Sequence, residues 1–226
     1  MAEAALDESE ALRLARMETI MRASQRTYWK TKRVLDVLVS IVLILLCAPI
    51  FAVLSLLIFV DDPHGSPFFS QTRVGLNGKT FTMYKFRTML VDAEAHWAEL
   101  AARNEMDGPV FKIKDDPRIT RVGKFLRKSS LDELPQFFNV LIGDMSMIGP
   151  RPPLPREVAE YTEYQRLRLS VKPGLSCIWQ VRSDRNALSF SEWVEEDMDY
   201  ILYASLRMDI KLILKTPLIM LRGEGC

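Results

Sequence analysis

The stretch that decides the fold is VLVSIVLILLCAPIFAVLSLLIFV, residues 37–60. No charged side chain interrupts this run of roughly two dozen residues, and a helix of that length can cross the hydrocarbon core of a bilayer. The run lies too far from the first residue for a secretory signal peptide, and no small-residue cleavage pattern follows it. The sequence therefore predicts a helix inserted in a membrane.

Two topologies fit this helix, because Pro49 lies near its midpoint. The basic residues Lys30, Lys32 and Arg33 precede the run and place its N-terminal end in the cytoplasm by the positive-inside bias. A kinked single span would carry the rest of the chain across the membrane. A sharp bend at the proline, where one backbone donor is lost, would return the helix to the face it entered. One turn after the basic cluster, Asp36 is expected to pair with Lys32 or Arg33.

Composition narrows the classes of function. The chain has 226 residues and a formal net charge of +1, so no global field favours nucleic acid, and none is expected as a partner. The three cysteines are widely spaced, and the two histidines, His64 and His96, stand apart from them. This pattern predicts neither a disulfide scaffold nor a zinc site.

The remaining elements define an α+β fold that is mostly helical. Residues 68–74 and 80–87 read as short strands, and the turn signal at 75–78 between them predicts a β-hairpin. Helices are expected at 93–103, 129–142, 157–169, 191–206 and 208–221. The predicted organisation is an N-terminal extension (1–28), helical or partly disordered, then the membrane helix (29–60) and a catalytic domain (61–226).

The last predicted helix, 208–221, mixes apolar residues with Lys211 and Lys215, and Arg207 directly precedes it. Basic residues beside a wide apolar face suit a helix lying on a membrane surface. A helix with one buried apolar face in the core would show a similar pattern. The sequence leaves these two placements open.

The stretch richest in potential chemistry is RKSSLDELP, residues 127–135. Ser130 and Glu133 have the spacing of a capping box, and acids are favoured in a first helical turn. Pro135 complicates that register, since it removes a helical bond if Ser130 is the N-cap but fits the first turn if Asp132 is. Structural capping is therefore one reading of the Asp132–Glu133 pair, with the cap residue open.

The same pair also suits covalent chemistry. A carboxylate can attack phosphorus, as in aspartyl-phosphate enzymes, but attack on a diphosphate must overcome repulsion between anions. A divalent cation and basic side chains would have to cancel that repulsion. The basic residues that could do so are Lys85, Arg87, Lys124, Arg127, Lys128 and Arg151. Arg151 lies between two prolines, in a stiff loop suited to presenting one guanidinium to a phosphate.

The order of the motifs resembles that of the bacterial sugar transferases, the monotopic polyprenyl-phosphate phosphoglycosyl transferases. The resemblance covers about residues 30–222 and rests on KR-x-x-D at 32–36, Pro49, KFRT at 85–88, SLDELPQ at 130–136, Asn139, GDMS at 143–146, GPRP at 149–152, KPG at 172–174, WQV at 179–181, Arg185-Asn186 and D-x-x-Y at 197–200. The chain resembles the minimal catalytic form of the family, because the extra N-terminal spans of longer members are missing from it.

The resemblance implies a specific reaction. Asp132 would be the nucleophile that attacks the β-phosphate of a UDP-sugar, releasing UMP and leaving a phosphosugar on the aspartate. Undecaprenyl phosphate, a polyprenol phosphate, would then take the sugar-phosphate, with Glu133 assisting. The family implies Mg²⁺ as cofactor, with Asp132 as a ligand. Phosphates would be held by Arg151 and Arg185, and further phosphate-binding candidates are Lys85 and Arg87.

The resemblance also implies a place in the cell and a pathway. The membrane helix would be re-entrant, broken at Pro49, and would hold the catalytic domain on the cytoplasmic face of the bacterial inner membrane. Surface helices would bed the domain in the lipid headgroups. The stretch 104–117 resembles initiators of exopolysaccharide synthesis, which favours UDP-galactose or UDP-glucose. A homo-oligomer and contacts with downstream glycosyltransferases are further expectations.

Two other functions fit parts of the sequence. A non-enzymatic membrane adaptor would use the basic loops to dock anionic lipid or a partner, and its binding would survive loss of both carboxylates. A multi-pass nucleotide-sugar transferase without a covalent step would be expected to show several hydrophobic segments. The single segment argues against that last class.

Overall fold

The computed structural model describes residues 25–93, 95, 108–110, 113, 116–185 and 187–221. This part of the chain is mostly helical, with one antiparallel β-hairpin and one short parallel strand pair, which confirms the α+β prediction. Most of the predicted extension 1–28, most of the predicted helix 93–103 and much of the stretch 104–117 lie outside the described residues, as does Asn186.

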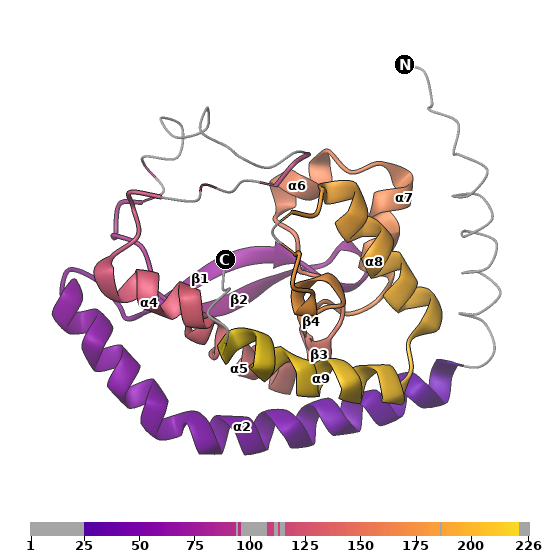
Figure 1. Ribbon diagram of the computed structural model, residues 1–226, viewed down its shortest axis with the longest axis horizontal. Helices are drawn as coiled ribbons and strands as arrows, with labels where there is room; N and C mark the ends of the chain where they lie inside the picture. The colour runs from indigo at the N-terminus through magenta and orange to yellow at the C-terminus, as the bar shows by residue number, and fades with distance from the viewer. Residues whose placement is uncertain are drawn as a thin grey trace.

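The predicted membrane helix is α2, Gln25–Asp61, and it continues through Pro49 rather than stopping there. The helix runs along one edge of the molecule and bends on the way (Figure 1); a proline inside a helix removes a hydrogen bond and favours such a bend. It is long and apolar enough to cross a membrane, and only 11% of its apolar stretch is buried within the protein. The re-entrant path stays a prediction.

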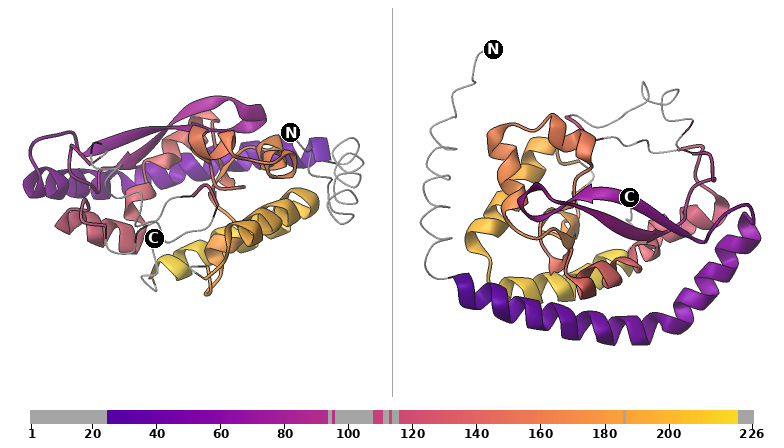
Figure 2. Two further views of the ribbon diagram at one scale, coloured as in Figure 1. Left: turned by 90° about the horizontal axis from the view of Figure 1, so that it is seen from above. Right: turned by 180° about the vertical axis from the view of Figure 1, so that it is seen from behind.

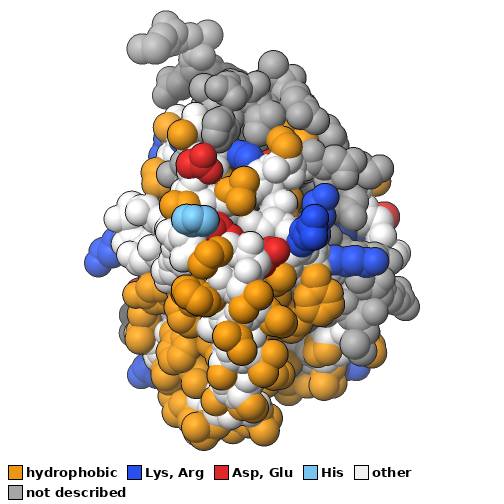
Figure 3. Space-filling view, turned by 90° about the vertical axis from the view of Figure 1, so that its left-hand side faces the viewer, with side chains coloured by type: hydrophobic (Ala, Val, Ile, Leu, Met, Phe, Trp, Pro, Cys, Tyr) orange, Lys and Arg blue, Asp and Glu red, His pale blue; other side chains and the backbone are white. Residues whose placement is uncertain are grey.

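Apolar side chains gather on one part of the surface, over α2 (Figure 3). The exposed large apolar residues of α2 are Val34, Leu35, Leu38, Ile41, Val42, Leu45, Leu46, Ile50, Val53, Leu56, Leu57, Phe59 and Val60. An exposed apolar patch of this kind marks a membrane or protein contact. The distribution supports membrane association through this helix.

Asp36, on the N-terminal half of α2, has a different partner from the one expected. Its carboxylate accepts hydrogen bonds from Ser146 Oγ at 2.7 Å and from the Met147 backbone N–H at 3.0 Å. The predicted pairing of Asp36 with Lys32 or Arg33 was therefore wrong. The sequence spacing identifies only possible partners of Asp36 on the same helix. The strand residues that bind Asp36 lie far away in the chain.

Lys32 forms a buried ion pair, with its Nζ 3.0 Å from Asp209 Oδ2 and both side chains about 5% exposed. Asp209 also accepts hydrogen bonds from the hydroxyls of Tyr28 and Tyr200, each at 2.8 Å. A buried carboxylate needs several donors to offset its lost hydration. This network ties the start of α2 to the C-terminal part of the chain.

The β-hairpin matches the prediction. Strands β1 (Phe68–Val74) and β2 (Thr80–Phe86) pair antiparallel, with Phe69 opposite Lys85 and Arg73 opposite Phe81. The turn between them holds the short 3₁₀ helix η1, Leu76–Gly78, in which Asn77 has a φ of 56°. Asn and Gly tolerate this left-handed conformation, which explains the turn signal in the sequence.

The predicted helix 129–142 was wrong, because the structure divides this stretch. Helix α4 (Arg121–Ser129) ends where Ser130 takes a left-handed φ of 54°, the 3₁₀ turn η3 (Leu131–Glu133) follows, and α5 (Gln136–Ile142) begins after Pro135. The Ser130 side chain makes no capping hydrogen bond, so the capping box is not formed. Asp132 is not an N-cap either. Both structural explanations of the acidic pair therefore fail.

Arg33, the basic residue that follows Lys32 in α2, binds the end of α5. Its guanidinium donates to the carbonyls of Val140 and Leu141 at 2.5 and 2.8 Å. Carbonyls in the last turn of a helix lack partners within the helix, and a basic group there also suits the helix dipole. The membrane helix and the segment that carries the acidic pair are thus joined directly.

The C-terminal half is helical but more divided than expected. The predicted helix 157–169 was too long, because α6 (Pro155–Ala159), α7 (Glu163–Arg166) and the 3₁₀ helix η4 (Leu167–Ser170) share this region. Thr162 starts α7 by accepting a hydrogen bond from the Gln165 backbone N–H at 3.3 Å. Helices α8 (Phe190–Tyr203) and α9 (Leu206–Leu221) match their predictions within a few residues.

Helix α9 combines the two placements that its sequence left open. Leu212 and Ile219 are buried against the core, whereas Ile210, Leu214 and Leu218 are exposed. One side therefore packs on the domain, and another apolar side faces outward as expected of a membrane-surface helix. Seen from above, the hairpin and α9 lie on opposite sides of the molecule (Figure 2).

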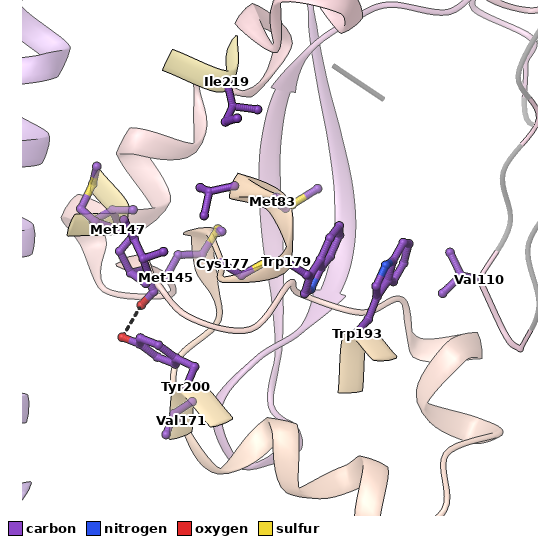
Figure 4. Close-up of a cluster of buried hydrophobic side chains, with 14 of the residues drawn as sticks. Met83, Val110, Met145, Met147, Val171, Cys177, Trp179, Trp193, Tyr200 and Ile219 are labelled. Carbon is purple, nitrogen blue, oxygen red and sulfur yellow. Dashed lines mark hydrogen bonds between the residues drawn. The ribbon is translucent and has the colours of Figure 1, made fainter. Parts of the chain in front are cut away.

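The core lies between these layers and includes the parallel pair β3 (Ser146–Ile148) and β4 (Gly174–Ser176). Trp179 and Trp193 stack with ring centroids 4.2 Å apart and planes 4° from parallel (Figure 4). Tyr200 donates a hydrogen bond to the Ile148 carbonyl at 3.1 Å. These contacts fix the loops that follow β3 and β4, which carry much of the site.

Gly123 gives a direct test of the packing between α4 and the chain after β2. A Cβ atom there would lie 2.1 Å from the carbonyl oxygen of Thr88. We predict that Gly123→Ala lowers the free energy of unfolding by about 1–3 kcal/mol, despite the better helix propensity of alanine, because backbone must move. Denaturant unfolding in detergent measures this. The exposed neighbour Lys124→Ala should change stability by less than about 0.5 kcal/mol, and equal effects would contradict the close approach.

Candidate active site

The acidic pair lies at a junction of three elements. Asp132 and Glu133 come from the η3 turn, and Lys85 reaches them from β2. The Lys85 Nζ lies 2.8 Å from Glu133 Oε1 and 3.6 Å from Asp132 Oδ2. One ammonium thus contacts both carboxylates, and the structure brings together three of the residues predicted for the site.

Asn139 fixes the distance between β2 and the acidic pair. This fully buried residue of α5 donates from Nδ2 to the Thr82 carbonyl at 2.7 Å, and its Oδ1 accepts from the Tyr84 backbone N–H at 3.0 Å. The Asn139 side chain therefore supplies hydrogen-bond partners to the backbone groups at the edge of β2, as a neighbouring strand would. Because Lys85 follows Tyr84 directly, its backbone is held against the segment that carries the acids.

The electrostatics separate the two acids. Burial raises the pKa of Asp132, as does the negative charge of Glu133, while the positive charge of Lys85 acts in the opposite direction. For Glu133, burial is outweighed by the charge and hydrogen bond of Lys85, followed by the charge of Arg151, and its pKa is lowered. Two neighbouring acids with pKa values moved apart are typical of catalytic pairs.

A pocket with about 340 Å³ of empty space, open to solvent, adjoins this cluster. Its walls consist of Arg73, Met83, Lys85, Glu133, Gln136, Arg151, Pro152, Gly174, Leu175 and Gln180. Asp132 is not one of the wall residues. Its carboxylate lies 3.6 Å from the ammonium of the wall residue Lys85, and its side chain is about 10% exposed. Glu133 therefore lines the open space, and Asp132 is next to a residue that does.

Arg151 lies in the pocket wall, as the proline-rich loop predicted. Its Nη1 is 3.3 Å from Glu157 Oε2, and that buried carboxylate also accepts from the Leu154 backbone N–H at 3.0 Å. The pairing orients the guanidinium while its side chain stays about 25% exposed. An oriented, partly exposed guanidinium in a pocket suits phosphate binding.

Arg87 does not line the pocket. Its guanidinium binds the Asp62 carboxylate and donates to the backbone carbonyls of Asp62, Gly65 and Ser66. It therefore closes the loop after α2, and these contacts favour a structural role over the predicted phosphate contact. Arg185 lies behind the pocket wall and donates to the Gln180 carbonyl at 2.9 Å.

Three of the polar and charged residues that line the pocket were not predicted as site residues: Arg73, Gln136 and Gln180. Strand periodicity would have placed Arg73 on the same face of the hairpin as Lys85, since it pairs with Phe81 and every second residue of a strand shares a face. A basic residue on the inner face of a predicted strand is a usable signal. Gln136 and Gln180 belong to the SLDELPQ and WQV motifs that carry the family resemblance, but neither was assigned a role in the site.

The residues fit a magnesium ion only in part. No group of three or more His, Cys, Asp or Glu side chains suited to a metal occurs in the described ranges. Mg²⁺ is usually bound through one or two carboxylates, with water and substrate phosphates completing its shell. Asp132 and Glu133 match that donor set. The site is therefore suited to Mg²⁺ arriving with a diphosphate, and Asp132 as a ligand stays a prediction.

Comparison with known proteins assigns the family. The chain matches the bacterial sugar transferase family over residues 27–223 and therefore belongs to it. It is similar to galactosyl transferase CpsE of Streptococcus agalactiae serotype III, with 47% identity over 194 residues covering 86% of this chain and 43% of that protein.

Two further relatives differ in length. Undecaprenyl-phosphate galactose phosphotransferase of Salmonella typhimurium is 40% identical over 201 residues, covering 86% of this chain and 41% of the relative. Exopolysaccharide production protein ExoY of Sinorhizobium fredii is 38% identical over 190 residues, covering 82% of this chain and 83% of the relative. The chain thus spans less than half the length of CpsE and the Salmonella enzyme.

The contacts of Arg87 generate a prediction that separates structure from substrate binding. Arg87→Gln should lower the free energy of unfolding by about 3 kcal/mol, because Asp62 loses its buried partner. Thermal unfolding in detergent measures this, with Lys79→Gln at the exposed hairpin turn as a control expected to change little. Unchanged stability together with a raised KM for a nucleotide sugar would instead make Arg87 a substrate ligand.

Proposed function

We propose that this protein transfers a hexose-1-phosphate from a UDP-sugar to undecaprenyl phosphate, releasing UMP, through a phosphosugar bonded to Asp132. The observation that carries the proposal is the Lys85 ammonium in contact with both acids at the edge of a pocket lined by Arg73 and Arg151. Membership of the bacterial sugar transferase family supports it.

In the first step, a carboxylate oxygen of Asp132 attacks the β-phosphorus of the UDP-sugar. The bond from that phosphorus to the bridging oxygen breaks, and UMP departs with the electron pair. Lys85 holds the ionised acids and reduces the repulsion between the carboxylate and the diphosphate. Arg151 binds phosphate oxygen at the pocket wall. Mg²⁺, when bound, supplies further neutralisation of negative charge at the phosphates.

In the second step, a phosphate oxygen of undecaprenyl phosphate attacks the phosphorus of the intermediate. The bond to the Asp132 oxygen breaks, which regenerates the carboxylate and gives undecaprenyl-diphospho-sugar. Glu133 is kept ionised by its lowered pKa, and it is the carboxylate placed to accept a proton from the acceptor phosphate, although the same lowered pKa makes it a weak base. Splitting the transfer into two displacements lets both substrates use one pocket in turn.

Helix α2 packs against α5, whose first residue Gln136 lines the pocket, and this arrangement suits a lipid acceptor. The apolar surface of α2 and the exposed side of α9 would bring the site to the inner leaflet of the bacterial inner membrane, where a soluble donor meets a lipid carrier. A re-entrant α2 keeps the domain on the cytoplasmic side. The names of the relatives favour galactose among the hexoses, since both CpsE and the Salmonella enzyme are named for it.

The adaptor function accounts less well for the site. Docking on anionic lipid would require basic residues on the surface, but it gives no reason to bury an acidic pair against a lysine. A multi-pass transferase is not supported either, because α2 is the one helix of sufficient length and apolarity in the described part of the chain. Loss of activity without loss of membrane binding distinguishes the transferase from the adaptor.

Substitution of the acids tests the nucleophile. With Mg²⁺, UDP-galactose and undecaprenyl phosphate, Asp132→Asn should reduce UMP release by roughly 10³-fold or more, because the amide is a poor nucleophile. The exposed carboxylate Asp184 provides a matched control, and Asp184→Asn should retain near wild-type release. Full activity of Asp132→Asn with inactive Glu133→Gln would move the nucleophile to Glu133.

The pH profile of kcat/KM provides a second test, because the direction of each shift is predicted. Attack requires ionised Asp132, whose pKa is raised, so UMP release should fall as pH drops through that pKa. Lys85→Met removes a charge that lowers this pKa and should move the acid limb to higher pH. Glu133→Gln removes a charge that raises it and should move the limb to lower pH. Shifts in the same direction, or none, would contradict the assigned electrostatics.

A further inference from the structure

Arg73 is a buried charged residue of the pocket wall to which the mechanism above gives no step. It lies on β1 with only about 8% of its surface exposed. Its Nη1 donates to the Pro152 carbonyl at 3.0 Å, and its Nη2 donates to Gln71 Oε1 at 2.7 Å. Its Nε has no partner within the described part of the chain, and no carboxylate there lies within ion-pair distance.

This arrangement is electrostatically incomplete. Burying a guanidinium with no carboxylate in direct contact is costly, because the charge loses its hydration. The negative charges of Glu157 and Glu133 favour the charged form of Arg73, but neither forms an ion pair with it. The positive charge of Arg151 adds to the cost: burial first, and then this neighbour, lower the pKa of Arg73. Two like charges held close together at one pocket are favoured when an anion binds between them.

The position of Arg73 shows where that anion would lie. Arg73 pairs across the hairpin with Phe81, and Phe81, Met83 and Lys85 alternate onto one face of β2. Arg73 and Lys85 therefore share a face, and both line the same pocket. The hydrogen bond to Pro152 also links Arg73 to the residue directly after Arg151. The two guanidinium groups thus belong to one wall, whereas Lys85 stands at the acids.

We propose that Arg73 and Arg151 form the subsite for the phosphate of the leaving nucleoside monophosphate, while Lys85 serves the phosphate that is attacked. This inference rests on the proposed function. When the diphosphate bond breaks, the leaving phosphate gains a negative charge, and two fixed guanidinium groups stabilise that charge where it develops. Arg73 acts here as a substrate-binding residue with a part in leaving-group departure.

Inhibition by UMP and by uridine tests this subsite, since the two ligands differ only in the phosphate. Arg73→Met should weaken inhibition by UMP by about 10-fold or more and change inhibition by uridine less than about 2-fold. Arg73→Lys, which keeps the charge but loses the planar fork, should fall between wild type and Arg73→Met. Lys79→Met, which removes an exposed basic side chain from the turn of the same hairpin, is the control and should be inhibited like wild type by both ligands.

The outcomes separate the subsite from the overall function. A wild-type protein that releases no UMP from any UDP-sugar contradicts the proposed function itself. If the wild-type protein does release UMP, and inhibition by UMP is unchanged in Arg73→Met, the subsite alone is overturned. Equal weakening of UMP and uridine also overturns it, because Arg73 would then only support the loop at Pro152. Should Arg73→Met fail to fold, the ratio of the two inhibition constants in Arg73→Lys decides.

Discussion

The contact of one lysine with two adjacent acids is the interaction on which the rest of the site depends. Lys85 lies within 2.8 Å of Glu133 and 3.6 Å of Asp132, in a position largely withdrawn from water. Without that ammonium, two neighbouring carboxylates at the edge of a pocket would repel each other and any phosphate. With it, one acid is held ionised while the other keeps a raised pKa. The pair is therefore suited to receiving a diphosphate.

Buried polar residues help to maintain this contact alongside the apolar core. Asn139 joins the helix after the acids to the strand that carries Lys85, and Arg33 joins the end of that helix to α2. Asp36 and Lys32 then bind α2 to β3 and to α9. Helix α2 and the acidic pair are thus connected by a chain of hydrogen-bonded polar residues, so that insertion of α2 in a membrane would fix the height of the pocket above the bilayer.

Much of the fold and part of the site could be predicted from the sequence. The membrane helix, the hairpin and α8 and α9 followed from local patterns of apolar and turn residues. The predicted capping box at Ser130 was wrong, because the left-handed conformation of Ser130 depends on tertiary packing that a capping pattern does not show. The ion pair of Arg87 with Asp62 could not be predicted for a similar reason: the two residues are far apart in the chain, and only the structure shows the contact. Lys85, Arg151 and the acids were candidates from their residue types, and the family resemblance gave them specific roles, whereas Arg73 required the strand register.

The most direct test of the central claim is to isolate the covalent intermediate. Purified protein is incubated with Mg²⁺ and UDP-galactose without a lipid acceptor, quenched in acid and digested, and the peptides are analysed by mass spectrometry. A hexose-phosphate attached to Asp132, released when undecaprenyl phosphate is added before the quench, is the predicted result. UMP formation with no modified peptide, or modification at a different residue, would contradict the account.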